Sequence, residues 1–173
     1  ASGGHLRLFG AETGMWKFPL TRDACRSEVL FGNPIAQPTA IIRVAPLRQH
    51  GTRFGDDWPR IGEDWMLWAR MLQYGEMDNL DRPLVEYRRG EQNSTFGIRR
   101  ADYRAVILKD VFSLLDIPFD EERCGLHLMA LRSFRAKPDG DTVRRFKAWL
   151  DELRSMNTAR GLFPEPAFGA RLD

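Results

Sequence analysis

Two adjacent carboxylates, Glu63 and Asp64, stand where a polar loop passes into an apolar segment. A carboxylate in the first turn of a helix lies at the positive end of the helix dipole, near backbone N–H groups that lack partners. One interpretation is that the pair only caps the helix. The other is that Asp64 is a general base, because a rigidly held carboxylate facing a loop can take a proton from a substrate hydroxyl.

The helix that carries this pair is predicted over residues 63–74, with Gly75 placed to end it. Its apolar side chains occupy almost the whole circumference, which is typical of a helix buried on most sides. We therefore expect Trp65 and Trp68 to be core residues. Trp58, in the Gly/Asp/Arg-rich loop over 51–62, is the candidate for stacking on a sugar.

The elements before this helix predict a mixed α/β unit. Thr21 is a plausible cap for a helix over 22–31, and a Pro-punctuated turn follows at 33–38. Three segments have the alternating or β-branched apolar character of strands, the second of them with the pattern of a buried strand. These segments are residues 5–10, 39–44 and 80–87.

After residue 99 the pattern changes to amphipathic helices. Three are predicted, the first ending before Pro118, the second capped by Asp120 and the third capped by Asp141 or Thr142. They cover residues 103–115, 120–134 and 142–156. We therefore divide the chain into an α/β part, residues 1–95, and a helical extension, residues 96–173.

Several short pieces of the α/β part occur in a fixed order and spacing. They are the turn Asn33-Pro34-Ile35-Ala36-Gln37-Pro38-Thr39, the run Ile41-Ile42-Arg43, Gly51, the segment Gly62-Glu63-Asp64-Trp65-Met66-Leu67-Trp68-Ala69-Arg70 and the segment Pro83-Leu84-Val85-Glu86-Tyr87-Arg88. This order resembles the C-terminal part of the family 2 glycosyltransferases of the GT-A type, over roughly residues 5–95. The resemblance implies the acceptor-binding part of an α/β nucleotide-sugar transferase fold.

In that family the Asp of the Glu-Asp pair is the base that deprotonates the acceptor hydroxyl, so the resemblance assigns this role to Asp64. Glu63 would then position the acceptor or orient the base, and the sugar would be transferred with inversion. The further residues expected to contact substrate are Asn33, Gln37, Trp58, Arg88 and Arg89. The last two are expected at the donor phosphates, although a strand-end arginine can also be an ordinary solvated charge.

The family also uses a divalent cation, Mg²⁺ or Mn²⁺, to neutralise the leaving diphosphate. Its metal-binding Asp-x-Asp motif, which follows a strand in the N-terminal half of the domain, is absent from the α/β part of this sequence, and Asp56-Asp57 lies in the wrong place, so we expect no metal site within this chain. The His that many relatives carry shortly after Tyr-Arg is also missing, because Arg89-Gly90 follows here.

The resemblance thus implies a bacterial enzyme of polysaccharide biosynthesis. Its donor would be a nucleotide sugar, and its acceptor a glycan, a lipid-linked molecule or a protein. The chain opens on Ala1-Ser2-Gly3-Gly4 without Met, so we expect a cut within a larger protein or a cloning remnant. Without the donor-binding half, we expect the chain alone to be inactive and to bind no nucleotide diphosphate tightly.

The bulk composition restricts the partners and the location. The net charge is +2, from 26 basic and 24 acidic residues, which does not favour nucleic acid or an anionic membrane. No apolar run reaches the roughly 18 residues of a membrane span. We expect a protein of the cytoplasm or of the inner face of the membrane, with Cys25 and Cys124 as buried free thiols.

Two further expectations concern assembly. The rival to the enzyme hypothesis is a non-catalytic helical interaction module, in which the amphipathic helices over 99–157 bind a partner protein. A sheet that lacks its N-terminal strands also keeps free edges, and free edges tend to pair with another copy. We therefore expect association as a dimer, with residues 5–10 or 39–44 near the contact.

Overall fold

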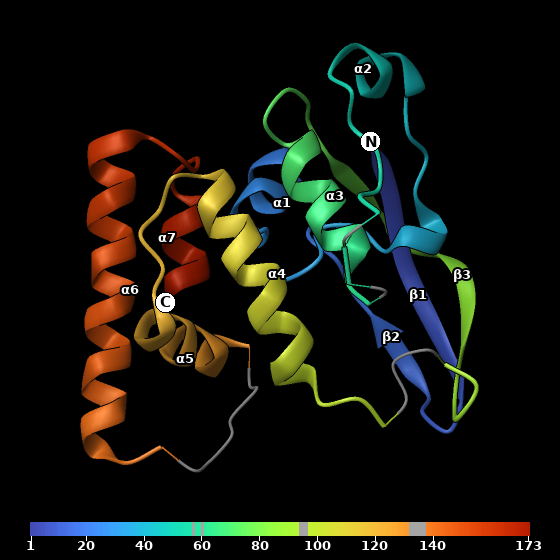
Figure 1. Ribbon diagram of the computed structural model, residues 1–173. Coiled ribbons are helices and arrows are strands. Elements are labelled where there is room, and N and C mark those ends of the chain that lie inside the picture. The colour runs from blue at the N-terminus through green and yellow to red at the C-terminus, as the bar shows by residue number, and fades with distance from the viewer. Residues whose placement is uncertain (57, 60, 94–96, 132–137) are drawn as a thin grey trace.

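The computed structural model describes residues 1–56, 58–59, 61–93, 97–131 and 138–173. Within these residues a small sheet is combined with helices that dominate the second half of the chain (Figure 1). The elements are β1 Ser2–Gly10, β2 Gly14–Trp16, α1 Arg22–Glu28, the 3-10 turn η1 Gln37–Thr39, α2 Val44–Gln49, α3 Glu63–Met71, β3 Asp78–Arg89, α4 Arg100–Leu114, α5 Glu121–Ala130, α6 Gly140–Arg160 and α7 Ala167–Leu172. The predicted mixed α/β class is confirmed.

The sheet is mixed, with three strands among the described residues in the order β2-β1-β3. The central strand β1 pairs with β2 in antiparallel and with β3 in parallel orientation. Parallel strands need a long crossover, and here the crossover contains α1, η1, α2 and α3. In Figure 1 α3 runs in the direction opposite to β1, and the end of α3 lies near the start of β1.

The prediction of a buried strand over 39–44 is wrong. Only one backbone bridge forms there, in which Ser2 and Ile41 exchange N–H···O bonds of 3.0 and 2.8 Å. The Ile41 residue is 76% exposed. Pro38 lies in η1 and Pro46 lies in the first turn of α2, so the β-branched run is too short to pair before the chain turns into a helix.

The free strand edges expected at 5–10 and 39–44 are not present. β1 is the central strand: it pairs with β3 along its length, and Leu6, Arg7 and Leu8 also pair with β2. Segment 39–44 is not a strand, so it has no row of backbone groups with which a second copy could pair. Of the two segments that we expected near a dimer contact, 5–10 therefore already has strand partners within the chain, and 39–44 forms only the bridge to Ser2.

Helix starts agree better with the sequence than helix ends do. The hydroxyl of Thr21 accepts a hydrogen bond from the Ala24 N–H at 3.2 Å, and the Asp120 carboxylate accepts one from the Arg123 N–H at 2.8 Å. Both predicted caps are confirmed. The cap of α6 is Asp139, not Asp141 or Thr142. The helix predicted after Asp120 ends at Ala130 in the structure, and residues 132–134 of that prediction lie outside the described residues.

One hydrophobic core joins the α/β part to the helices. In Figure 1 the sheet lies on one side, α1 and α3 lie in the middle, and α4–α7 lie on the other side. Buried side chains of α1, α3, α4, α5, α6 and α7 belong to a single cluster, which includes the thiols of Cys25 and Cys124. Both thiols are buried and neither is in a disulfide bond, as the sequence predicted.

His127 of α5 lies at the centre of this core and is fully buried. Its Nε2 is 2.6 Å from the carbonyl oxygen of Leu30, just after α1, and its Nδ1 is 3.1 Å from the indole Nε1 of Trp149 in α6. A carbonyl can only accept and an indole N–H can only donate. The imidazole is therefore the neutral Nε2–H tautomer, and it joins α5 to elements from both parts of the chain.

Candidate active site

Asp64 lies in the first turn of α3, immediately after Gly62 and Glu63. One carboxylate oxygen, Oδ1, accepts a hydrogen bond from the Trp65 backbone N–H at 2.9 Å. The other, Oδ2, accepts one from the side-chain amide of Asn33 at 3.0 Å. The structure thus brings together two predicted site residues that are 31 positions apart in the sequence.

The surroundings of Asp64 raise the pKa of its carboxyl group, mainly because the group is removed from water. The hydrogen bonds from Trp65 and Asn33 act in the opposite direction, and the negative charge of Glu63 adds to the rise. A general base works best when its pKa is not far below the operating pH, since a stronger base accepts the proton more readily. Partial burial therefore suits Asp64 to proton transfer better than full exposure does.

Gly62 places α4 directly against the start of α3. Its φ is +83°, which L side chains rarely adopt. A Cβ at this position would lie 2.1 Å from Cδ1 of Ile107 in α4, which is too close for any side chain. Without a side chain at this position, α4 packs closely on the backbone that leads into the carboxylate pair, and Ile107 would have to shift to admit one.

Trp58 is not an open platform in this structure. The guanidinium carbon of Arg70 lies 4.5 Å from the centre of its ring, and the ring of Phe54 meets it edge-on at 6.1 Å. Arg70 also forms a two-pronged salt bridge with Asp110 of α4, at 2.6 and 2.8 Å. One ring face is therefore used to fasten the loop before α3 to α3 and α4.

The remaining predicted residues lie apart from the carboxylate. Arg89, near the end of β3, is 3.4 Å from Glu12 and stacks over Trp16, with 4.9 Å between the guanidinium carbon and the ring centre. Arg88 is exposed, and so is Gln37 at the start of η1. Of the loop pair, Asp56 is exposed and Asp57 lies outside the described residues.

The carboxyl ends of the parallel strands carry only part of the predicted site. Open α/β sheets bind ligands outside the carboxyl ends of their parallel strands. Arg88 and Arg89 are the last residues of β3, and Gly10 is the last of β1. The first turn of α3, by contrast, lies level with the middle of β1 (Figure 1).

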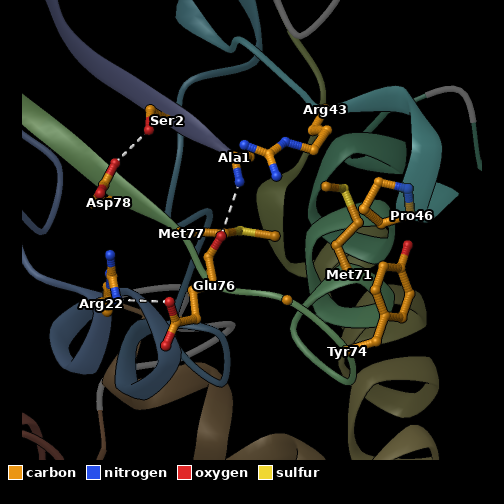
Figure 2. A pocket seen from close by; sticks show the side chains of 11 residues that line it. Ala1, Ser2, Arg22, Arg43, Pro46, Met71, Tyr74, Glu76, Met77 and Asp78 are labelled. Atoms are coloured by element: carbon orange, nitrogen blue, oxygen red, sulfur yellow. Dashed lines mark hydrogen bonds and ion pairs between the residues drawn. The ribbon is translucent and has the colours of Figure 1, made fainter.

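A cavity of about 330 Å³ lies at the opposite end of α3 (Figure 2). Met71 and Tyr74, near the end of α3, line one wall, and the starts of β1 and β3 line the other. Along a helix that rises 1.5 Å per residue, Asp64 is roughly 10 Å from Met71. The cavity is therefore separate from the carboxylate and lies at the amino ends of the strands.

Much of the polar lining of this cavity is already paired. Arg22 and Glu76 form a salt bridge of 2.7 Å, Ser2 donates to Asp78 at 2.5 Å, and the amino group of Ala1 donates to the Glu76 carbonyl at 2.8 Å (Figure 2). Arg43 points toward Ala1 from the far side. These contacts hold the starts of β1 and β3 together and contain no group in a catalytic arrangement.

No cluster of three or more His, Cys, Asp or Glu side chains that could hold a metal ion occurs in the described part of the chain. Among the same residues, no helix is long and apolar enough to cross a membrane.

The residue that sequence reasoning missed is Asn79, the second residue of β3. It is buried, and its amide donates to the carbonyls of Pro19 and Pro34 at 2.6 and 2.8 Å. Nothing in the sequence indicates that Asn79 makes a buried contact, because an Asn after Gly75-Glu76-Met77-Asp78 has the character of an ordinary turn residue. The contact becomes visible only when β3 is paired with β1.

Comparison with known proteins gives two partial similarities. An uncharacterized glycosyltransferase of Haemophilus influenzae is 35% identical over 82 residues, which are 47% of this chain and 25% of that protein. The multifunctional CCA protein of Variovorax paradoxus is 32% identical over 139 residues, which are 73% of this chain and 32% of that protein. No family model and no solved structure matches the chain.

The chain thus spans about a third or less of the length of these curated relatives. Its similarity to a glycosyltransferase is distant and partial. The fold and the site define a mixed α/β unit with a half-buried carboxylate–amide pair at a helix start.

Proposed function

We propose that this chain forms the acceptor side of a glycosyltransferase active site of the GT-A, family 2 type, with Asp64 as the general base. The observation that carries the proposal is the Asn33–Asp64 pair. An acidic side chain with a raised pKa is held at 3.0 Å by an amide from a separate turn, in a segment of the chain with the family's order of motifs.

The reaction on this proposal is a single displacement. The acceptor hydroxyl oxygen forms a bond to the anomeric carbon, and its proton passes to the Asp64 carboxylate. The bond between that carbon and the diphosphate oxygen breaks on the opposite side, and the diphosphate leaves with the electron pair. Attack and departure on opposite faces invert the anomeric configuration.

The other predicted residues have supporting roles in this proposal. Glu63, next to the base, orients the acceptor, and Asn33 holds the Asp64 carboxylate. Gln37 and Trp58 contact the acceptor, while Arg88 and Arg89, at the carboxyl end of β3, contact the donor phosphates. Because Arg89 is bound by Glu12 and Trp16, Arg88 is the better placed of the two for an incoming phosphate.

The rest of the machinery is proposed to lie outside this chain. The described residues supply no set of ligands for Mg²⁺ or Mn²⁺, so no step here is assigned to a metal. The relatives are three to four times longer than their matched segments, which leaves room for a donor-binding half. On this view the chain alone is inactive, and the complete enzyme works in the cytoplasm or at the inner face of the membrane.

The rival interaction-module hypothesis is weaker against the same facts. Its amphipathic helices were to present apolar faces to a partner, but the apolar residues Ile107, Val111, Leu128, Trp149 and Leu153 are all buried in the chain's own core. The two relatives have names that indicate different functions, a glycosyltransferase and a multifunctional CCA protein. The carboxylate–amide pair supports the glycosyltransferase proposal, because a held carboxylate can serve as the base that this chemistry needs.

The test is acceptor-dependent release of nucleoside diphosphate from a panel of UDP-, GDP- and dTDP-linked sugars, with mixed bacterial glycans and lipid-linked sugars as acceptors. The protein to use is the full-length protein that contains this chain. Release that requires an acceptor supports the proposal. A full-length protein that folds but releases nothing with any donor contradicts it.

A further inference from the structure

The side chain of Asn79 connects β3 to both ends of α1. Asn79 is only 7% exposed. Its amide nitrogen donates to the carbonyl oxygen of Pro19, before α1, at 2.6 Å and to that of Pro34, after α1, at 2.8 Å. An amide NH₂ group has two hydrogens, and these two bonds are the short ones. The same nitrogen is also 3.6 Å from the Sγ of Cys25 in α1.

The second of these bonds acts on the candidate site through the next residue in the chain. Asn33 precedes Pro34, and a residue before proline is restricted to extended backbone conformations. The proline ring fixes one backbone angle of its own residue as well. With the Pro34 carbonyl held by Asn79, little freedom is left for Asn33, whose amide donates to Asp64 at 3.0 Å.

The packing around Asn79 shows that this contact is tightly built. A Cβ on Gly3 of β1 would lie 2.7 Å from Oδ1 of Asn79 and 2.5 Å from Cγ2 of Ile35, so glycine is needed for the turn to approach the sheet. The buried Oδ1 of Asn79 has no partner among the described residues. An unpaired buried oxygen is unfavourable, and the two bonds that the amide nitrogen donates to the Pro19 and Pro34 carbonyls offset this cost.

We infer that Asn79 is a positioning residue for the candidate base: by holding the Pro34 carbonyl, it keeps the Asn33 amide where it can donate to the Asp64 carboxylate. The catalytic meaning of this contact rests on the proposed function. The chain of contacts from Asn79 to Asp64 does not, and it can be tested without any substrate.

The test is a carbon NMR titration of the Asp64 carboxyl group in the isotopically labelled chain, for Asn79→Ala and Asn79→Thr. Neither substitution removes a charge, so a change in the Asp64 pKa reports a change in geometry. The Asn33 bond stabilises the ionised form, and its loss raises the pKa. Asn33→Ala gives the full rise as a reference. Asn79→Ala is expected to give much of this rise. Asn79→Thr is expected to give a smaller rise, because Thr keeps one donor and suits a strand.

Asn157→Ala is the matched control. Asn157 is 4% exposed and donates two hydrogen bonds, to the Phe163 carbonyl at 3.1 Å and to Glu165 at 2.8 Å, at the far end of α6. Its loss is expected to lower the melting temperature about as much as Asn79→Ala does, with the Asp64 pKa unchanged.

An Asp64 pKa that stays at the wild-type value, or falls, in the folded Asn79 variants overturns the inference. If Asn79→Ala does not fold, Asn79→Thr decides by the same measure. The outcome is independent of the proposed function: an active Asp64→Asn enzyme would remove Asp64 from the mechanism, while the dependence of its pKa on Asn79 would stand.

Discussion

At the scale of single residues, the half-buried Asp64 and the fully buried His127 show how differently this fold treats titratable side chains. Asp64 keeps contact with solvent and receives two hydrogen bonds that favour its charged form. His127 is fully buried, and burial lowers its pKa to about 4. The first arrangement keeps a group ready to exchange a proton, whereas the second keeps one neutral so that it can join three elements.

The pKa of His127 gives a prediction for the pH dependence of stability. Its value falls from 6.5 to about 4 on folding, so between these values the unfolded chain binds the extra proton. The stabilisation from neutral His127 is complete above pH 6.5 and is lost as the pH falls toward 4. The loss amounts to about 3 kcal/mol, at 1.36 kcal/mol per pKa unit.

Urea unfolding of the wild-type chain and of His127→Gln at pH 7, 5.5 and 4.5 measures this loss. Gln keeps a donor for the Leu30 carbonyl and an acceptor for the Trp149 indole, but it does not titrate. The variant should therefore lose less stability than the wild type between pH 7 and 4.5. Equal losses would show that protonation of His127 does not limit acid stability.

At the scale of elements, the contact between α3 and α4 determines where α3, the helix that carries the candidate base, begins. The critical residue is Gly62, whose backbone touches Ile107 and whose φ is +83°. Replacing it with Ala combines backbone strain of about 1–2 kcal/mol with overpacking of about 1–3 kcal/mol. We expect Gly62→Ala to lower the free energy of unfolding by the sum of the two.

Gly51→Ala is the control for this prediction, because Gly51 also has a positive φ, +62°, but a Cβ there would meet nothing within 4 Å. It should show the strain alone. Combining Gly62→Ala with Ile107→Val should recover part of the overpacking cost. Equal destabilisation by Gly62→Ala and Gly51→Ala would mean that α4 does not constrain the start of α3.

Sequence reasoning succeeded at elements governed by local rules. The caps Thr21 and Asp120 follow from side-chain chemistry within three residues, and the structure confirms both. The prediction of a strand over 39–44 was wrong because we gave its β-branched pattern more weight than the prolines on either side. The short helix α7 was missed because it depends on packing against α1, which is remote in the sequence.

The same distinction holds for the candidate site. Asp64 was found because a carboxylate pair before an apolar helix is a local pattern. Its proximity to Asn33 was expected only from the family resemblance. Asn79 could not be found, since its two bonds span 60 and 45 positions and depend on strand pairing. Trp58 was expected as a stacking surface, and its contact with Arg70 depends on how the loop folds back over α3.

At the scale of the whole molecule, the boundary drawn near residue 95 from composition does not interrupt the core. One cluster of buried side chains runs from Cys25 in α1 through α3 and α4 to Phe168 in α7. His127 adds polar contacts between α5, α6 and the residue Leu30. A core of this kind predicts that the two parts depend on each other for stability.

The corresponding prediction is a single cooperative unfolding transition. Thermal unfolding followed by far-ultraviolet circular dichroism, which reports mainly the helices, should coincide with unfolding followed by tryptophan fluorescence. Trp65 and Trp68 lie in the α/β part and Trp149 lies in α6, so both parts are reported. Two separate midpoints, or a native-like spectrum for residues 1–95 alone, would contradict the prediction.

The central claim is that Asp64 accepts the proton of an acceptor hydroxyl, and Asp64→Asn tests it most directly. The variant should keep its fold, because the amide oxygen of Asn can still accept the hydrogen bond from the Trp65 N–H. The Asn33 amide can also reverse, so that its unpaired Oδ1 accepts from the new amide. Asp139→Asn, at the cap of α6, is the matched control, because Asp139 also accepts a backbone N–H at a helix start.

The measurement is the turnover number of the full-length protein with each variant, together with its melting temperature. For Asp64→Asn we predict a melting temperature close to that of the wild type and a turnover number lower by about 10²–10⁴-fold. This loss corresponds to roughly 3–5 kcal/mol of barrier. Asp139→Asn should turn over normally. Near-normal turnover by a folded Asp64→Asn enzyme would contradict the account, and would leave Asp64 with the structural role of a first-turn carboxylate.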